Sequence, residues 1–262
     1  MTRVQVMVDG AKQMKEMELE SDTLIYNGLH YEPEDLSYQA PCTGTIYGVL
    51  MNDRDYVEKM ESTFHQEPYH HPPVHPILYI KPINTVNAHK KYIPMPEGED
   101  EIQVNGTLGM IIRKTTVNVT PENALEYVAG YTIVNDISIE HNDFHRPNIK
   151  NKVRDGFCPI GPWIVRSDRI PDPNDIKIRV SVNDNVKQVI DTSQVIRKAS
   201  ALLSEISTFM TFREGDVLLL GIFDGAPIAQ VGDTVRIDVD EIGSLENRII
   251  KETEPAVGGG VL

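Results

Sequence analysis

The chain has 262 residues, a formal net charge of −14, and 40% hydrophobic and 24% charged residues. This composition is typical of a globular protein. A chain of this length buries about three quarters of its unfolded surface, so it does not need disulfides or bound metals to stabilise its fold. The acidic balance disfavours nucleic acid and anionic membranes as partners, while it still permits a locally basic pocket for a small anion.

Residues 1–40 have the pattern of a small β-rich unit. The short stretches RVQVMV, KEMELE and TLIYNGLHY are separated by the turn signals Asp9-Gly10 and Asn27-Gly28. The first residues contain no apolar signal-peptide core, and no run approaches the about 18 apolar residues of a membrane span. Pro41 is the expected boundary to the main domain, residues 41–250, and residues 251–262 are expected to be a flexible tail.

The main domain begins with a predicted strand at Thr45–Met51 and an amphipathic helix at Arg54–Phe64. Four prolines within residues 65–76 exclude regular structure and predict a loop that could act as a lid. ILYIK (Ile77–Lys81) and LGMIIR (Leu108–Arg113) are predicted strands.

The second half of the chain contains two further predicted helices. Thr120-Pro121 has the signature of a helix start, and a long helix is predicted over Thr192–Phe212 from its apolar periodicity. Between them, IKIRVSVN alternates as a strand and Asp184-Asn185 suits a hairpin turn. Many short strands, few helices and no regular βαβ alternation predict an α+β fold. No P-loop or GxGxxG occurs, so no nucleotide cofactor is expected.

The segment 128–165 is the best candidate for a site. Its apolar run ends in Asn135-Asp136, and Lys152 and Arg154 follow shortly afterwards. An acid at the end of a buried strand near basic residues is often part of a site for an anionic substrate. Two structural alternatives stay open: an Asp136 that caps backbone amides, and an ion-pair network of Lys152 and Arg154 with Asp143 and Asp155.

The two cysteines, Cys42 and Cys158, are far apart and have no CxxC spacing. This argues against a disulfide framework or structural zinc and fits a reducing, cytoplasmic location. Cys158 is expected to be a packed thiol rather than a nucleophile.

Six motifs occur in an order that resembles the fumarylacetoacetate hydrolase family, over about residues 41–250. They are TIYGVLMN, ILYIKP, ALEYVAGYTIVNDIS, RDGFCPIGPWIV, REGDVLLLG and GSLEN. Within the family, FHRPNIKNKVRDGFCPIGPW is most similar to the first-half unit of the bifunctional isomerase/decarboxylase of 4-hydroxyphenylacetate (homoprotocatechuate) degradation. The resemblance implies a mixed, barrel-like β-roll with few helices.

The resemblance also implies one divalent metal, Mg²⁺ or Mn²⁺, bound by a Glu-x-Glu pair and an Asp, which polarises a 2-oxo acid. The Asp falls on Asp136, whereas the two glutamate positions are Asn105 and Thr107. Lys152 and Lys81 fall on the family's lysines and are the expected catalytic residues. Arg154 and Arg146, together with Lys152, are expected to bind the substrate.

Other departures concern the lid and the possible replacement ligands. The lid positions that carry His and Glu in the family are Tyr56 and Lys59. His141 and His145, four residues apart, could rebuild a metal site if that segment were helical, although Pro147 limits any helix there.

Three functions are compatible with these residues. The first is an isomerase or decarboxylase of 2-oxo or 2-hydroxy-diene dicarboxylates in aromatic catabolism. The second is a catalytically impaired subunit that pairs with a metal-bearing paralogue, and the third is a dicarboxylate-binding protein. A homodimer, or a heterodimer with a paralogous subunit, is expected.

Overall fold

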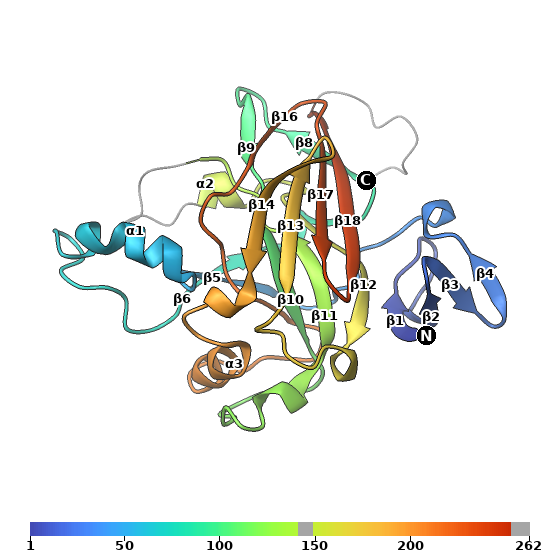
Figure 1. Cartoon of the computed structure of the whole chain (residues 1–262), viewed down its shortest axis with the longest axis horizontal. Helices are drawn as coiled ribbons and strands as arrows, with labels where there is room; N and C mark the ends of the chain where they lie inside the picture. Colours follow the sequence, from blue (N-terminus) through green and yellow to red (C-terminus); the bar gives the residue numbers. More distant parts are fainter. Residues whose placement is uncertain (141–148, 253–262) are drawn as a thin grey trace.

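The structure is a computed structural model and describes residues 1–140 and 149–252. Two β-sheets form the framework of this part of the chain (Figure 1). The larger sheet has eleven strands, in the spatial order β4 (Leu29–Tyr31), β3 (Thr23–Tyr26), β2 (Lys15–Glu20), β1 (Thr2–Val6), β12 (Cys158–Arg166), β11 (Val128–Asn135), β10 (Gly106–Ile112), β15 (Val217–Leu219), β5 (Ile46–Leu50) and β6 (Ile77–Lys81), with β7 (Val86–Ala88) paired to β12.

The second sheet has five strands, in the order β14 (Asn185–Asp191), β13 (Lys177–Val182), β17 (Thr234–Val239), β18 (Gly243–Lys251) and β8 (Tyr92–Met95), and a separate pair joins β16 (Ile228–Gln230) to β9 (Glu101–Gln103). The α-helices are α1 (Arg54–Phe64), α2 (Ile149–Lys152) and α3 (Ala199–Ser207). The short 3₁₀ helices are η1 (Pro33–Asp35), η2 (Ile83–Thr85), η3 (Ala124–Tyr127), η4 (Ser167–Arg169) and η5 (Thr192–Gln194). The predicted α+β class is confirmed, and neither sheet closes into a barrel over the described ranges.

The core lies between the two sheets, with β10 at its centre. All seven residues of β10 are buried, as its continuous apolar sequence predicts for a strand covered on both faces. A Cβ at Gly106 would lie 2.8 Å from Val180 Cγ2 and 3.1 Å from Ile237 Cγ2. Only glycine therefore lets the second sheet approach β10 this closely.

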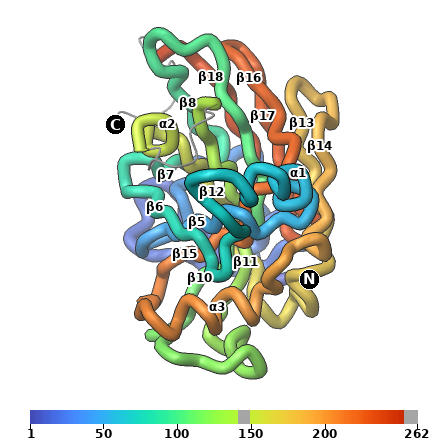
Figure 2. The backbone as a smooth tube through the Cα atoms, turned by 90° about the vertical axis from the view of Figure 1, so that its left-hand side faces the viewer, coloured from blue at the N-terminus to red at the C-terminus, as the bar shows by residue number. Residues whose placement is uncertain are grey.

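Helix α1 has the predicted bounds, whereas the other two helices are much shorter than predicted. The residues after Thr120 form a turn and the short helix η3, in which Asn123 Oδ1 accepts a hydrogen bond from the Thr120 backbone N–H at 3.1 Å. The long helix predicted from Thr192 is reduced to α3, which lies beyond the end of β10 in both views (Figures 1 and 2).

The loop after β5 prevents that long helix from starting earlier. The Arg197 backbone N–H donates to Asn52 Oδ1 at 2.8 Å, and the Ile196 N–H donates to the Asn52 carbonyl at 2.8 Å. These tertiary bonds hold the chain extended before α3, and the local apolar periodicity cannot reveal them.

The β13–β14 hairpin turns at Asn183-Asp184, one residue before the predicted Asp184-Asn185. Both turn residues have positive φ, 50° and 62°. Such values are typical of a type I′ turn, which Asn and Asp tolerate.

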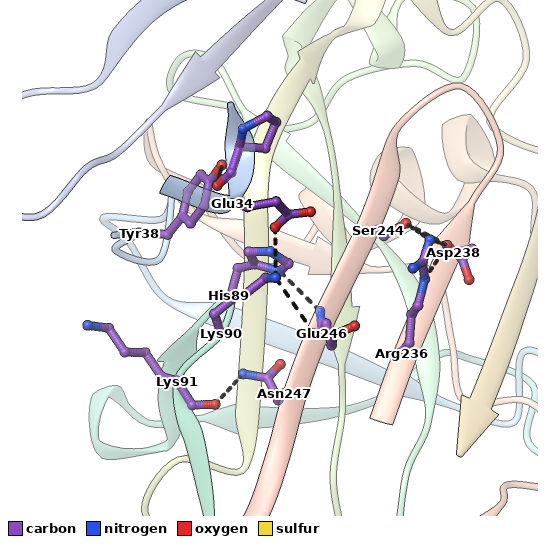
Figure 3. Close-up of polar contacts among 11 residues, drawn as sticks. Glu34, Tyr38, His89, Lys90, Lys91, Arg236, Asp238, Ser244, Glu246 and Asn247 are labelled. Carbon is purple, nitrogen blue, oxygen red and sulfur yellow. Dashed lines mark hydrogen bonds and ion pairs between the residues drawn. The ribbon is translucent and has the colours of Figure 1, made fainter. Parts of the chain in front are cut away.

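The N-terminal strands continue the large sheet, because β1 pairs with β12 in the register Val4↔Val165. Lys90 Nζ also bridges to Glu34 Oε2 at 2.7 Å and to Glu246 Oε1 at 3.8 Å (Figure 3). The division into units 1–40, 41–250 and 251–262 stays a prediction, and residues 253–262 lie outside the described part. Within residues 1–140 and 149–252, no helix is long and apolar enough to span a membrane.

His89 is buried at this junction, where it is 7% exposed. Its Nδ1 accepts a hydrogen bond from the Glu246 backbone N–H at 3.1 Å, and the Tyr38 ring packs edge-on at 5.1 Å between centroids (Figure 3). Burial, assisted by the charge of Lys90, lowers the pKa of His89 from 6.5 to about 4. The folded state therefore holds this imidazole neutral.

We expect the stability of the protein to decrease between pH 6.5 and pH 4 because of His89. The unfolded chain takes up this proton near pH 6.5 and the folded chain only near pH 4, so acid favours unfolding. This difference in pKa corresponds to about 3 kcal/mol of the free energy of unfolding. That stability is fully present above pH 6.5 and is lost as the pH falls toward 4. Urea denaturation across this range should show a flatter pH profile for His89→Asn, while the exposed-site control His30→Asn keeps the wild-type profile. Equal profiles for wild type and His89→Asn would contradict the prediction.

Candidate functional site

Residues from opposite parts of the large sheet meet at Asp136, immediately after β11. Tyr79 and Lys81 come from β6, although β5, β15 and β10 lie between β6 and β11 in the sheet. Side chains can bridge this separation only because the sheet curls strongly, as in a β-roll. Lys152, at the end of α2, completes the group.

Lys81 makes three oxygen contacts inside the protein. Its Nζ lies 2.8 Å from Asp136 Oδ1, and both side chains are fully buried. The same Nζ donates to the carbonyl oxygens of Ile137 and Lys152, each at 2.8 Å. Two of these contacts are hydrogen bonds and the third is an ion pair, so two of the three N–H donors of the ammonium are used by backbone carbonyls and its charge faces Asp136.

Tyr79 is the member of the group that the sequence analysis missed. Its hydroxyl donates a hydrogen bond to Asp136 Oδ2. Tyr79 is paired across strands with Gly48 of β5, where an added Cβ would lie only 1.9 Å from the Tyr79 Cζ. Gly48 thus allows the Tyr79 ring to lie over β5. The cross-strand pairing of this glycine with an aromatic residue is the only signal that could have identified Tyr79.

We expect Gly48→Ala to destabilise the protein by about 1–3 kcal/mol, because the new methyl group overlaps the Tyr79 ring and forces it to move. Guanidinium denaturation measures the loss. In a Tyr79→Ala background the same Gly48→Ala change should cost much less, since the overlapping ring is gone. A cost that is the same in both backgrounds would show that Tyr79 is not the group displaced.

Asn105 and Thr107 lie at the start of β10, beside Asp136. The Asn105 side-chain amide donates to the Asp136 carbonyl at 3.0 Å, and the Asp136 backbone N–H donates to the Asn105 carbonyl at 2.9 Å. Asn105 therefore holds the backbone of Asp136. Thr107 Oγ1 is buried, and the described residues offer it no hydrogen-bond partner.

The charges of the group are mutually dependent. Burial alone would raise the pKa of Asp136, but Lys81 and Lys152 hold it below its usual range. Burial lowers the pKa of Lys152, although Asp136 opposes this effect. Burial and the Asp136 carboxylate raise the pKa of Tyr79 well above its usual range. The group thus combines an ionised carboxylate, a phenol that keeps its proton, and a lysine that gives up its proton more readily than in water.

The segment around Lys152 is fixed by Asn84. Asn84 Nδ2 donates to the Val153 carbonyl at 2.9 Å and to Asp155 Oδ1 at 2.7 Å. Lys152 Nζ lies 4.8 Å from the centre of the Tyr79 ring, within the range of a cation–π contact. Arg154 is partly buried, and its Nε is buried with no hydrogen-bond partner in the described ranges.

Several predicted residues lie elsewhere. Arg146, Asp143 and the pair His141 and His145 fall outside the residues that the structure describes. On α1, Lys59 forms an ion pair with Asp224. Cys158 is fully buried, and burial raises the pKa of its thiol, which favours a packed side chain.

The residues around Asp136 do not fit a divalent metal. Mg²⁺ and Mn²⁺ prefer carboxylate and other oxygen ligands with open positions for water. Here Asp136 is the one carboxylate among the three positions, and both its oxygens already contact Lys81 or Tyr79. Over residues 1–140 and 149–252, no cluster of three or more His, Cys, Asp or Glu side chains could hold a metal ion.

Residues 45–250 match the family described as fumarylacetoacetate (FAA) hydrolase C-terminal. The chain belongs to this family. It is 37% identical over 211 residues to the 4-hydroxyphenylacetate degradation bifunctional isomerase/decarboxylase of Escherichia coli, over 80% of this chain and 48% of that protein. It thus spans about half the length of this relative. Protein Rv2993c of Mycobacterium tuberculosis is 34% identical over 236 residues, 89% of this chain and 86% of that protein.

Solved structures share the fold. The 5-carboxymethyl-2-hydroxymuconate delta-isomerase of Mycobacterium smegmatis has a TM-score of 0.79 at 27% identity and covers 97% of this chain and 100% of its own. A maleylpyruvate hydrolase of Sphingobium, solved with manganese and pyruvate, has a TM-score of 0.75 at 19% identity over 95% of this chain and 99% of its own. The second likeness shows the fold alone.

Proposed function

We propose that this chain is an isomerase or decarboxylase of 2-oxo or 2-hydroxy-diene dicarboxylates in aromatic catabolism, of the 4-hydroxyphenylacetate type. The family membership and the named activities of the relatives support the reaction class. The observation that carries the proposal for this chain is the buried group of Tyr79, Lys81, Asp136 and Lys152, which places fixed charges at one point of the fold.

Lys152 is the member best placed to touch a substrate. Of the three charged residues, Lys152 is the most exposed to solvent: 9% of its surface is accessible, against 1% for Lys81 and 0% for Asp136. Lys81 is fixed by three internal oxygen contacts, so we assign it a positioning role toward Asp136. Arg154, whose Nε has no hydrogen-bond partner among residues 1–140 and 149–252, and Arg146 are proposed to bind the substrate carboxylates.

The proposed isomerisation moves one proton within the substrate. The Lys152 amine accepts the proton of the 2-hydroxyl group, the electron pair shifts along the diene, and the resulting ammonium returns the proton to carbon, which gives the 2-oxo tautomer. Asp136 and the Tyr79 phenol keep Lys152 in place through charge and ring contact. In a decarboxylation, the ammonium form of Lys152 would stabilise the enolate that the loss of CO₂ leaves behind.

Turnover by the purified chain tests the proposal. 5-Carboxymethyl-2-hydroxymuconate and 2-hydroxyhepta-2,4-diene-1,7-dioate are suitable substrates, with loss of diene absorbance and product identification by NMR as readouts. Conversion of at least one of them is expected. Dicarboxylate binding without turnover would instead support the binding-protein alternative. Turnover that appears only after a carboxylate-bearing paralogue is added would support the partner-subunit alternative, and light scattering of the mixture would then report the heterodimer.

A further inference from the structure

We propose that the Lys81 ammonium takes the place of a divalent cation in this chain, so that the centre around Asp136 binds neither Mg²⁺ nor Mn²⁺. The inference rests on the donor atoms of the site and not on the proposed reaction. Binding can therefore be measured without any substrate.

The first argument is geometric. Lys81 Nζ lies 2.8 Å from Asp136 Oδ1 as an ion pair, although Oδ1 accepts no hydrogen bond among the described residues, and the Tyr79 hydroxyl donates to Oδ2. One carboxylate oxygen therefore faces a positive charge and the other a hydrogen-bond donor. Asn105 directs its amide N–H groups, which cannot bind a cation, toward the Asp136 carbonyl. A metal at this point would have to displace Lys81 from three oxygen contacts and would gain only one carboxylate ligand, that of Asp136.

The second argument concerns charge. Asp136 supplies one negative charge, which the ammonium of Lys81 already balances in the same buried region. Asn105 and Thr107 supply no charge. A divalent ion would add two further positive charges at a point where water cannot screen them, and such burial of unbalanced charge is strongly unfavourable.

The ammonium has one property that a bound metal lacks, since it is covalently attached to β6. It is held at Asp136 by the β5–β6 pairing, in which Ile46 lies opposite Lys81. The fixed positive charge is therefore present in every folded copy of the chain, whatever the metal concentration.

Mn²⁺ binding, followed by loss of the free-ion EPR signal, tests the inference. The wild-type chain is expected to leave the signal unchanged. The triple variant Lys81→Met/Asn105→Glu/Thr107→Glu presents three carboxylates without the ammonium and should bind one equivalent of Mn²⁺ at least about tenfold more tightly than wild type. The matched control Lys81→Met/Asn105→Gln/Thr107→Gln carries side chains of the same size as glutamate but without the negative charge. It should not bind Mn²⁺.

A second measurement needs no variant that could fail to fold. The melting temperature of the wild-type chain should be the same in EDTA and in millimolar Mn²⁺ or Mg²⁺, because a ligand that binds the folded state raises it. The proposal is overturned if wild type binds one equivalent of Mn²⁺ and Asp136→Asn abolishes that binding. It is overturned equally if the folded triple variant Lys81→Met/Asn105→Glu/Thr107→Glu fails to bind.

Discussion

Lys81→Met is expected to lower the free energy of unfolding by about 3–5 kcal/mol, because it leaves the buried Asp136 carboxylate without its counter-charge. Both side chains of this ion pair are fully buried, and Nζ and Oδ1 are 2.8 Å apart. The change also removes the two donors that Lys81 directs at the Ile137 and Lys152 carbonyls. Guanidinium denaturation at pH 7 measures the loss.

Two further variants separate the buried charge from the loss of packing. Lys81→Met/Asp136→Leu removes both charges and should recover much of the stability lost in the single variant, because no unpaired charge remains. Arg3→Met removes one partner of an exposed pair, in which Arg3 and Glu16 are about half exposed and 3.3 Å apart. That control should change the stability by less than about 1 kcal/mol. If Lys81→Met and Arg3→Met had equal effects, the Lys81–Asp136 pair would have no structural importance.

Lys152→Met is expected to lower kcat for the diene substrate by about 10²–10⁴-fold, the range for loss of a proton-transfer group. Methionine retains most of the side-chain volume over the Tyr79 ring, so the fold should be kept. Steady-state kinetics, with circular dichroism as a folding check, measures the effect.

Lys150→Met is the matched control for this variant. Lys150 is on the same short helix α2, but its side chain is exposed. This variant should keep wild-type kcat and KM. A Lys152→Met enzyme with unchanged kcat would remove Lys152 from the proposed mechanism, whereas a change confined to KM would reduce its role to substrate binding.

Much of the site was predictable because its charged residues follow strongly apolar strands. Asp136 ends a buried run, and Lys81 ends the strand that Pro82 terminates. A charged residue at the end of a buried strand cannot easily reach solvent, so it is recognisable in the sequence as a candidate for a specific role. Tyr79 was missed because an aromatic residue inside ILYIK has the pattern of a core residue. Its role depends on Gly48, which is opposite it on another strand.

The sequence by itself determined the family, the α+β class, helix α1 and the three charged residues that meet at the site. Local periodicity, strand-end position and motif order carry that information. Only the tertiary structure decided how the charge of Asp136 is balanced. Lys81 and Asp136 are far apart along the chain, and three strands separate β6 from β11 in the sheet. Electrostatic energy depends on distances in space, so only the curl of the sheet placed the Lys81 ammonium against the carboxylate that was predicted to bind a metal.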